Sequence, residues 1–294
     1  MSEAKAPIWM GIANAWECDE MGHMNVRFYL AKAGDAVALL LADLGVGAAS
    51  WQTNVQHIRY HRESHAGTPL KIYGQVVGVT ATTLDVALRI VSAPDDRLRA
   101  TLLASLTADA PWPDDFRAGC EAVIAPVPED AAPRGLPVAA PYPNPTLDIA
   151  DAAGLAEVGR LIVGRDQVDA EGYMNPHEVV SVISDSVIHL MCRITPARGA
   201  AGVTAGVGGA ALEQRILHRA RARAGDHVTL RSGVIEAGAK TMRFVHWLFN
   251  LRTGEAIATV EVVAVAFDLT ARRAIAVDDA TRARIADLAV AVYA

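Results

Sequence analysis

The sequence predicts an α+β protein that contains two copies of one unit, each an antiparallel sheet wrapped around a central helix. Three observations lead to this prediction. The segment DEMGHMN at 19–25 returns as DAEGYMN at 169–175. Each segment leads directly into a stretch whose apolar residues recur at helical spacing. Beyond each stretch follow apolar, β-branched segments of strand length. A repeat on this scale dictates the fold before any local argument does.

The repeat extends well beyond the two motifs. An offset of 150 residues aligns the motifs, and it also pairs Asp35 with Asp185 inside the two helical stretches. Farther on, Gly67 matches Gly225 at an offset of 158, and a few extra loop residues explain the change. The two copies are therefore expected to share one order of elements.

Three strand-length segments follow the helix in each copy. The turn signals APDD at 93–96 and RTGE at 252–255 separate the second segment from the third, so these strands are expected to be consecutive and antiparallel. Each copy thus runs strand, helix and then a meander. The predicted meander strands are 70–79, 83–91 and 99–107 in the first copy and 227–235, 241–251 and 256–267 in the second.

Proline separates the two copies. Nine of the fourteen prolines fall in 111–145, where they disfavour a continuous helix or strand. A short helix is still expected at 114–123, with a counterpart in the C-terminal segment DDATRARIADLAVAVYA. Because one sheet on one helix leaves an open edge and apolar surface, fusion of two copies makes the covering partner intramolecular. The predicted domains are residues 1–125 and 151–294, joined by a proline-rich linker at 126–150.

Composition excludes several classes of partner. The net charge of −6 and the pI of about 5.8 give no basic excess for nucleic acid or an anionic membrane. The three cysteines lack the paired spacing of a structural zinc site, and we expect them to be reduced. No basic segment with a long apolar run stands at the start, and no apolar run of about eighteen residues follows. The expected location is the cytoplasm.

The first motif places a carboxylate just ahead of a helix, where backbone N–H groups lack partners and the dipole is positive. Hydrolysis of an acyl thioester needs a carboxylate that activates water or attacks the carbonyl, and donors that stabilise the oxyanion. Asp19 and the helix end would supply both. Gly22 would let the backbone approach closely, and His23 or Asn25 would orient the reactants. An N-cap role would also account for Asp19 and Asn25.

The segment DEMGHMNVRFYL resembles the D-x-x-G-H-x-N-x-x-x-Y signature of the 4-hydroxybenzoyl-CoA thioesterase-like hotdog family. The strand VQHIRY at 55–60 also resembles that family, and the resemblance covers both halves apart from the linker. It implies tandem hotdog domains that form an intramolecular hotdog dimer. It further implies a thioesterase that acts on an acyl-CoA or an acyl-carrier-protein thioester without a cofactor. Because hotdog proteins often associate, a homo-oligomer of the fused pair is a further expectation.

The resemblance assigns roles to residues of the first copy. The family's catalytic carboxylate falls on Asp19, and its histidine and asparagine fall on His23 and Asn25. The aromatic position that closes the signature is Tyr29, which is expected to contact substrate.

The second copy keeps only part of this signature. Its carboxylate and asparagine are Asp169 and Asn175, but Tyr173 replaces the histidine and Val179 replaces the aromatic residue. The working site is therefore expected around Asp19, with Asp169 as a second site or a structural relic.

An acidic residue stands on each predicted helix. Asp35 and Asp185 lie where many hotdog enzymes carry an acid on the central helix. A carboxylate buried on an apolar helix is costly unless it is paired. Each is therefore either a substrate-side acid or a structural partner for an arginine such as Arg59 or Arg193.

A polar alternation follows the predicted helix of the first copy. On a strand, alternate residues from His57 to His65 would share one face, and three of them are histidines. The positions aligned with them in the second copy are no ligand set, so a solvated face is expected and no metal is predicted. His57, Arg59 and the arginines of the second copy are instead candidates for the phosphates of coenzyme A. The second-copy positions are Arg215, Leu217, Arg219, Arg221 and Arg223, with His218 and Arg231 nearby.

The sequence leaves competing functions open. No GxSxG elbow or recognisable cysteine nucleophile is present, so hydrolysis would be driven by a carboxylate acting as base or nucleophile. The alternatives are a hotdog protein that binds acyl thioesters without turnover and a hotdog hydratase or dehydratase.

Overall fold

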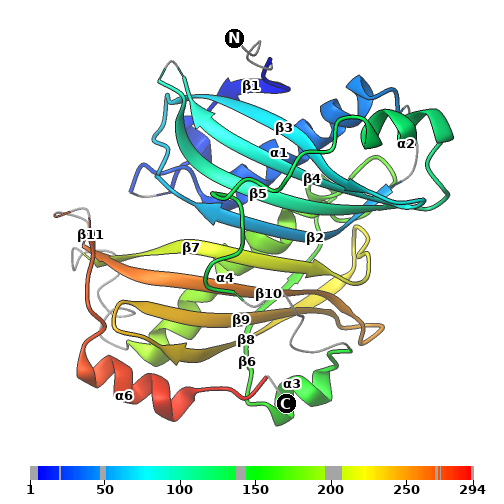
Figure 1. Ribbon diagram of the computed structural model, residues 1–294. Helices are drawn as coiled ribbons and strands as arrows, with labels where there is room; N and C mark the ends of the chain where they lie inside the picture. The colour runs from blue at the N-terminus through cyan, green and yellow to red at the C-terminus, as the bar shows by residue number, and fades with distance from the viewer. Residues whose placement is uncertain are drawn as a thin grey trace. The chain divides into compact units, whose positions relative to one another are not determined.

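The computed structural model describes residues 6–19, 21–46, 51–93, 95–136, 144–195, 207–268, 271 and 273–292. The chain divides into two compact units, Met1–Pro133 and Arg134–Ala294, here called unit 1 and unit 2 (Figure 1). The division falls inside the segment 126–150 that the sequence assigns to the linker.

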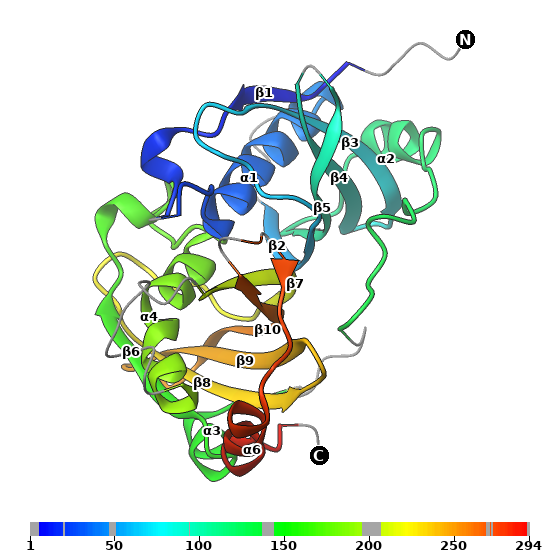
Figure 2. The ribbon, with the colours of Figure 1, turned by 90° about the vertical axis from the view of Figure 1, so that its left-hand side faces the viewer.

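Unit 1 is an antiparallel sheet with a long helix against it. The strand order is β1-β3-β4-β5-β2, and every neighbouring pair is antiparallel. The helix α1 packs against β1 and β3, as Figures 1 and 2 both show. The elements are β1 (Trp9–Ile12), a 3-10 turn (Ala15–Glu17), α1 (Val26–Asp43), β2 (Trp51–Tyr60), β3 (Pro69–Val79), β4 (Thr83–Ser92), β5 (Arg97–Ala108) and α2 (Asp114–Glu121).

The apolar face of α1 explains why the sheet wraps around it. Leu30, Val37 and Leu41 recur at helical spacing and are at most 3% exposed. Burial of each such side chain stabilises the fold by about 1.5–3 kcal/mol. On β3, Gly74 leaves room for the side chain of Ile8, because a Cβ atom there would lie 2.7 Å from Cδ1 of Ile8.

Unit 2 repeats this architecture. Its strand order β6-β8-β9-β10-β7 matches that of unit 1 strand by strand, and the short β11 adds to β10. The helix α4 packs against β6 and β8. The elements are α3 (Leu147–Ala152), β6 (Ala156–Ile162), a 3-10 turn (Arg165–Gln167), α4 (Glu178–Ile194), β7 (Val207–His218), β8 (His227–Ala237), β9 (Thr241–Asn250), β10 (Ala256–Asp268), β11 (Arg273–Ala274) and α6 (Asp279–Leu288).

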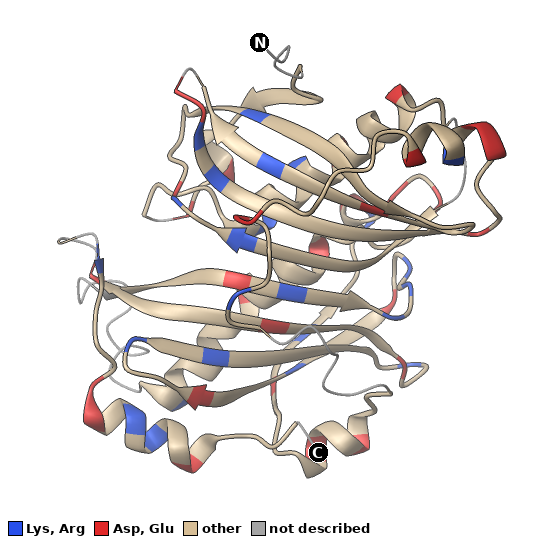
Figure 3. Cartoon of the chain, viewed as in Figure 1, with Lys and Arg blue, Asp and Glu red and all other residues tan. Residues whose placement is uncertain are grey.

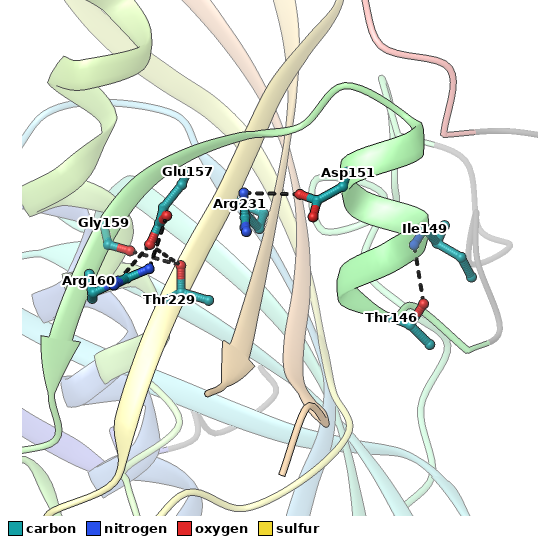
Figure 4. A network of polar contacts seen from close by, with 8 residues as sticks. All are labelled: Thr146, Ile149, Asp151, Glu157, Gly159, Arg160, Thr229 and Arg231. Carbon is teal, nitrogen blue, oxygen red and sulfur yellow. Dashed lines mark hydrogen bonds and ion pairs between the residues drawn. The ribbon is translucent and has the colours of Figure 1, made fainter. Parts of the chain in front are cut away.

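The core of unit 2 contains an aromatic pair on β9. Trp247 and Phe249 on β9 are fully buried, and their rings meet edge to face with centroids 6.3 Å apart. Outside this core, polar contacts attach α3 to the sheet: Arg231 of β8 pairs with Asp151 at 3.1 Å (Figure 4). Nearby, Glu157 pairs with Arg160 at 2.8 Å.

The distribution of charge and the length of the helices are two further features of the structure. Basic and acidic residues are interspersed along both sheets in the view of Figure 3. Within the described ranges, every helix is too short or too polar to cross a bilayer.

Candidate active site

The first motif forms a closed turn just before α1. The Oδ1 atom of Asp19 accepts hydrogen bonds from the backbone N–H groups of Met21, at 2.9 Å, and His23, at 3.0 Å. The N–H of Asp19 donates to the carbonyl oxygen of His23 at 2.9 Å, which closes the turn. Gly22 has a φ of 76°, a left-handed conformation that explains why glycine stands there. The turn therefore fixes the Asp19 carboxylate through the backbone.

The second carboxylate oxygen of Asp19 is left for other partners. Within the part of the chain that the structure describes, no donor or cation pairs with Oδ2 of Asp19. The neighbouring thiol is a poor competitor as nucleophile, because burial and the nearby Asp19 charge raise the pKa of Cys18. The turn thus presents a half-buried carboxylate with one oxygen free to take a proton.

The N-terminus of α1, which follows the motif turn directly in the sequence, carries a hydrogen-bond donor. Asn25 is the N-cap: its Oδ1 accepts from the N–H of Arg27 at 3.0 Å, and its own N–H donates to the carbonyl oxygen of Glu17 at 2.9 Å. The N–H of Phe28 donates to the carbonyl oxygen of Asn25. In the first turn of α1, the N–H of Val26 has no acceptor among the described residues. Such a donor at a positive helix end suits a developing oxyanion.

Tyr29 lies in the core of unit 1. Its side chain is 3% exposed, and its hydroxyl accepts a hydrogen bond from the N–H of Ser64 at 3.0 Å. Its ring meets that of Tyr60 edge to face, and burial raises the pKa of Tyr29. This predicted substrate residue thus contacts Tyr60 at the end of β2 and Ser64 in the segment that follows.

The segment after β2 departs from the predicted alternation. The strand ends at Tyr60, so only His57 and Arg59 of the predicted polar face lie on it, and the prediction of one continuous face is wrong. The chain turns instead, and Gly67, with a φ of 86°, completes the turn. That glycine is the sequence signal that could have marked the end of the strand.

This turn brings two further side chains to the motif. A bridge pairs His23 with His65, and the N–H of Met24 donates to the carbonyl oxygen of Ser64 at 2.8 Å. Nδ1 of His23 lies 3.3 Å from a carboxylate oxygen of Glu63, and the rings of His23 and His65 meet edge to face at 4.8 Å. The sequence did not predict that Glu63 and His65 lie next to His23.

Unit 2 repeats the backbone of the turn. The N–H of Tyr173 donates to Oδ1 of Asp169 at 2.8 Å, and the N–H of Asp169 donates to the carbonyl oxygen of Tyr173 at 2.7 Å. Gly172 has a φ of 80°. The side chain of Asn175 differs from its counterpart: its Nδ2 donates to the carbonyl oxygen of Gln167 at 3.1 Å, and α4 begins only at Glu178.

The side chains around the second turn differ in charge. Arg221 pairs with Oδ2 of Asp169 at 2.7 Å and lies over the ring of Tyr173 at 3.6 Å. Arg223 lies over the same ring at 3.9 Å and donates to its hydroxyl. By the repeat, these arginines stand where unit 1 has Glu63 and His65. The oxygen that is free on Asp19 is therefore taken by an arginine on Asp169.

The two helix acids are not buried. Asp35 on α1 and Asp185 on α4 are exposed, which corrects the expectation of a carboxylate held inside an apolar helix face. The ion pairs suggested for them are absent from the described residues: the structure gives Arg59 other partners, and Arg193 is exposed. At these helical positions the side chains point away from the sheet, so solvation replaces pairing.

Most of the basic residues considered for phosphate binding contact the protein itself. Arg59 donates from Nη1 to the carbonyl oxygens of Asp130, at 2.9 Å, and Ala132, at 3.0 Å, and so holds the segment after α2. His57 is buried on β2. In unit 2, Arg215 forms a buried ion pair with Glu261.

Comparison with known proteins gives the same picture. The family model of the thioesterase-like superfamily matches residues 13–118 and 163–285, which are the two repeats. No curated protein sequence matches the chain.

Solved structures of similar architecture extend over both repeats. An oleoyl thioesterase of Lactobacillus plantarum has a TM-score of 0.65 at 12% identity, with 87% of this chain and 94% of that chain covered. A 12:0-ACP thioesterase of Umbellularia californica has a TM-score of 0.64 at 8% identity, with 88% and 93% covered. An acyl-ACP thioesterase of Bacteroides thetaiotaomicron has a TM-score of 0.60 at 11% identity, with 87% and 96% covered. At these identities the likeness concerns the fold, and it confirms the tandem hotdog architecture.

Proposed function

Because the chain belongs to the thioesterase-like superfamily, we propose that it hydrolyses an acyl thioester of coenzyme A or of an acyl-carrier protein at the Asp19 turn. The expectation of a thioester hydrolase is confirmed at the level of the family. Structural neighbours named for oleoyl and acyl-ACP thioesterase activity support an acyl substrate. The observation that carries the proposal for the site is the Oδ2 of Asp19, which has no partner among the described residues, in the turn that leads into α1.

In the proposed reaction, water adds to the thioester carbonyl while Oδ2 of Asp19 accepts its proton. The N–H of Val26 stabilises the oxyanion, the C–S bond breaks, and the proton passes to the leaving thiolate. Direct attack by Asp19 would instead break the C–S bond and form a mixed anhydride, and water would then cleave the anhydride to the free acid and Asp19, with its proton passing to the released thiolate. Both routes need the carboxylate held in place, and the hydrogen bonds from Met21 and His23 hold its Oδ1.

In this proposal only unit 1 hydrolyses substrate. The ion pair with Arg221 occupies the corresponding oxygen of Asp169 and offsets its negative charge. The pair therefore hinders this oxygen from taking a proton from water or attacking a carbonyl carbon. The second candidate function, binding of an acyl thioester without turnover, is favoured by this observation for unit 2 alone.

The experiment follows thiol release from a panel of acyl-CoA and acyl-carrier-protein substrates, with wild-type protein and Asp19→Asn. Saturable thiol release by the wild type, lost in the variant, is the expected result. Tight acyl-CoA binding by calorimetry without any thiol release would refute hydrolysis and favour the binding protein. Retention in the cytoplasm and self-association of the fused pair stay predictions of the sequence.

A further inference from the structure

Three metal-ligating side chains of unit 1 meet beside the motif turn. One nitrogen each of His23 and His65 and one oxygen of Glu63 lie within 4.8 Å of one another. We propose that these three residues bind a divalent transition-metal ion of the zinc class. The proposed hydrolysis assigns no step to these side chains, and the orienting role that the resemblance gives His23 stays a prediction.

The donor set and its spacing fit such an ion. Zinc takes imidazole nitrogen and carboxylate oxygen at about 2.0–2.2 Å in tetrahedral sites, which puts neighbouring donors about 3.3 Å apart. Nδ1 of His23 and the oxygen of Glu63 are already 3.3 Å apart. The nitrogen of His65 must come closer to the other two donor atoms, and its exposed side chain can rotate to bring it there. Two histidines and one carboxylate leave a fourth position for water, as in three-ligand zinc sites.

The backbone holds these ligands in place without a metal. His23 is 6% exposed, and its N–H and carbonyl groups are both bonded to Asp19. The ligand turn is tied down at the peptide bond between Glu63 and Ser64: Arg99 donates to the carbonyl oxygen of Glu63 at 2.6 Å, and Tyr29 accepts from the N–H of Ser64. Pre-ordered ligands lose little conformational freedom on binding, so more of the binding energy is retained.

Unit 2 shows that the turn forms without these side chains, so the comparison of the two copies from which the sequence predicts no metal bears on unit 2 alone. The same backbone bridge there joins Tyr173 to Arg223, and Arg221 stands in place of Glu63. The three ligand positions are occupied there by Tyr173, Arg221 and Arg223, which do not bind cations of this class, although the backbone bridge is the same. The histidine–carboxylate set of unit 1 is therefore not needed to build the turn. An ion pair between His23 and Glu63 alone would not explain why the ring of His65 also lies next to His23.

The test is a zinc titration of the full-length chain by calorimetry after dialysis against a chelator, repeated with cobalt and followed by visible absorption. We expect one equivalent of zinc to bind at neutral pH, and tetrahedral cobalt to give an intense visible spectrum. Because His65→Gln removes a direct ligand, we expect it to weaken binding by more than about 100-fold, beyond the loss that follows when an outer-shell partner is removed. The matched controls are Arg223→Gln at the equivalent place in unit 2 and His189→Gln on the exposed side of α4.

Two outcomes would overturn the site: absence of zinc binding by the wild type, or equal affinity in the wild type and His65→Gln. Glu63→Gln is the second variant, and a circular dichroism spectrum of each variant establishes that it has folded. The experiments distinguish failure of the metal-site proposal from failure of the hydrolysis proposal. Asp19→Asn is expected to lose thiol release and keep its zinc, whereas loss of zinc in His65→Gln is read without any substrate.

Discussion

A buried histidine makes unit 2 sensitive to acid. His246 on β9 is 1% exposed, and its Nδ1 lies 2.7 Å from Oγ of Ser232 on β8. Burial lowers the pKa of His246 from 6.5 to about 3, because the charged imidazolium would lose its hydration in the core. Between these two values the unfolded chain binds a proton that the folded chain does not. Stability therefore falls as the pH falls through 6.5, and the loss levels off near pH 3.

The magnitude follows from the two pKa values. Between pH 7 and pH 4.5, linkage gives a loss of about 2.5 kcal/mol from His246 alone. Against a typical free energy of unfolding of about 5–15 kcal/mol, that is a substantial share. Replacement of His246 by Asn removes the titration and keeps an acceptor for Ser232.

The assay is urea unfolding of both proteins at pH 7 and pH 4.5, followed by tryptophan fluorescence, to which the buried Trp247 of the same strand contributes. Carboxylates titrate alike in both proteins, so the difference of the two losses isolates His246. We expect the wild type to lose about 2.5 kcal/mol more than His246→Asn. Equal losses in the two proteins would refute the reasoning.

Two further predictions concern the paired turns. Gly22→Ala should lower the free energy of unfolding by about 1–2 kcal/mol, because the left-handed φ of 76° is strained for alanine, although no atom lies within 4 Å of the new Cβ. Urea unfolding measures this loss, and an unchanged midpoint would contradict the strain argument. Arg221→Gln should change the free energy of unfolding by less than about 1 kcal/mol, since its ion pair with Asp169 is partly exposed and screened by solvent. A loss several times larger in the same urea assay would mean that the pair is a structural anchor.

The repeat explains why so much of the fold could be predicted. Apolar alternation places strands at 70–79 and 241–251, and the structure has β3 at Pro69–Val79 and β9 at Thr241–Asn250. The short helix expected at 114–123 is α2, Asp114–Glu121. These elements are set by local pattern, which one copy confirms in the other.

The surroundings of the site were harder to predict, because they depend on contacts between distant parts of the chain. The alternation of polar residues extended the predicted strand beyond Tyr60. In the structure the chain turns there and places Glu63 and His65 next to His23. The pair of Arg221 with Asp169 joins residues that are 52 positions apart, and a long side chain reaches such a partner without any periodic signal. Helical spacing identified the apolar face of α1 but did not show that Asp35 lies away from it, in solvent.

The most direct test of the proposed site compares the two turns. Steady-state kinetics of thiol release are measured for wild type, Asp19→Asn and Asp169→Asn with the best acyl thioester of the panel. We expect Asp19→Asn to lower kcat by at least about 100-fold, as loss of a general base does, and Asp169→Asn to leave kcat essentially unchanged. Wild-type turnover in Asp19→Asn, or equal losses in the two variants, would contradict a single working site at Asp19.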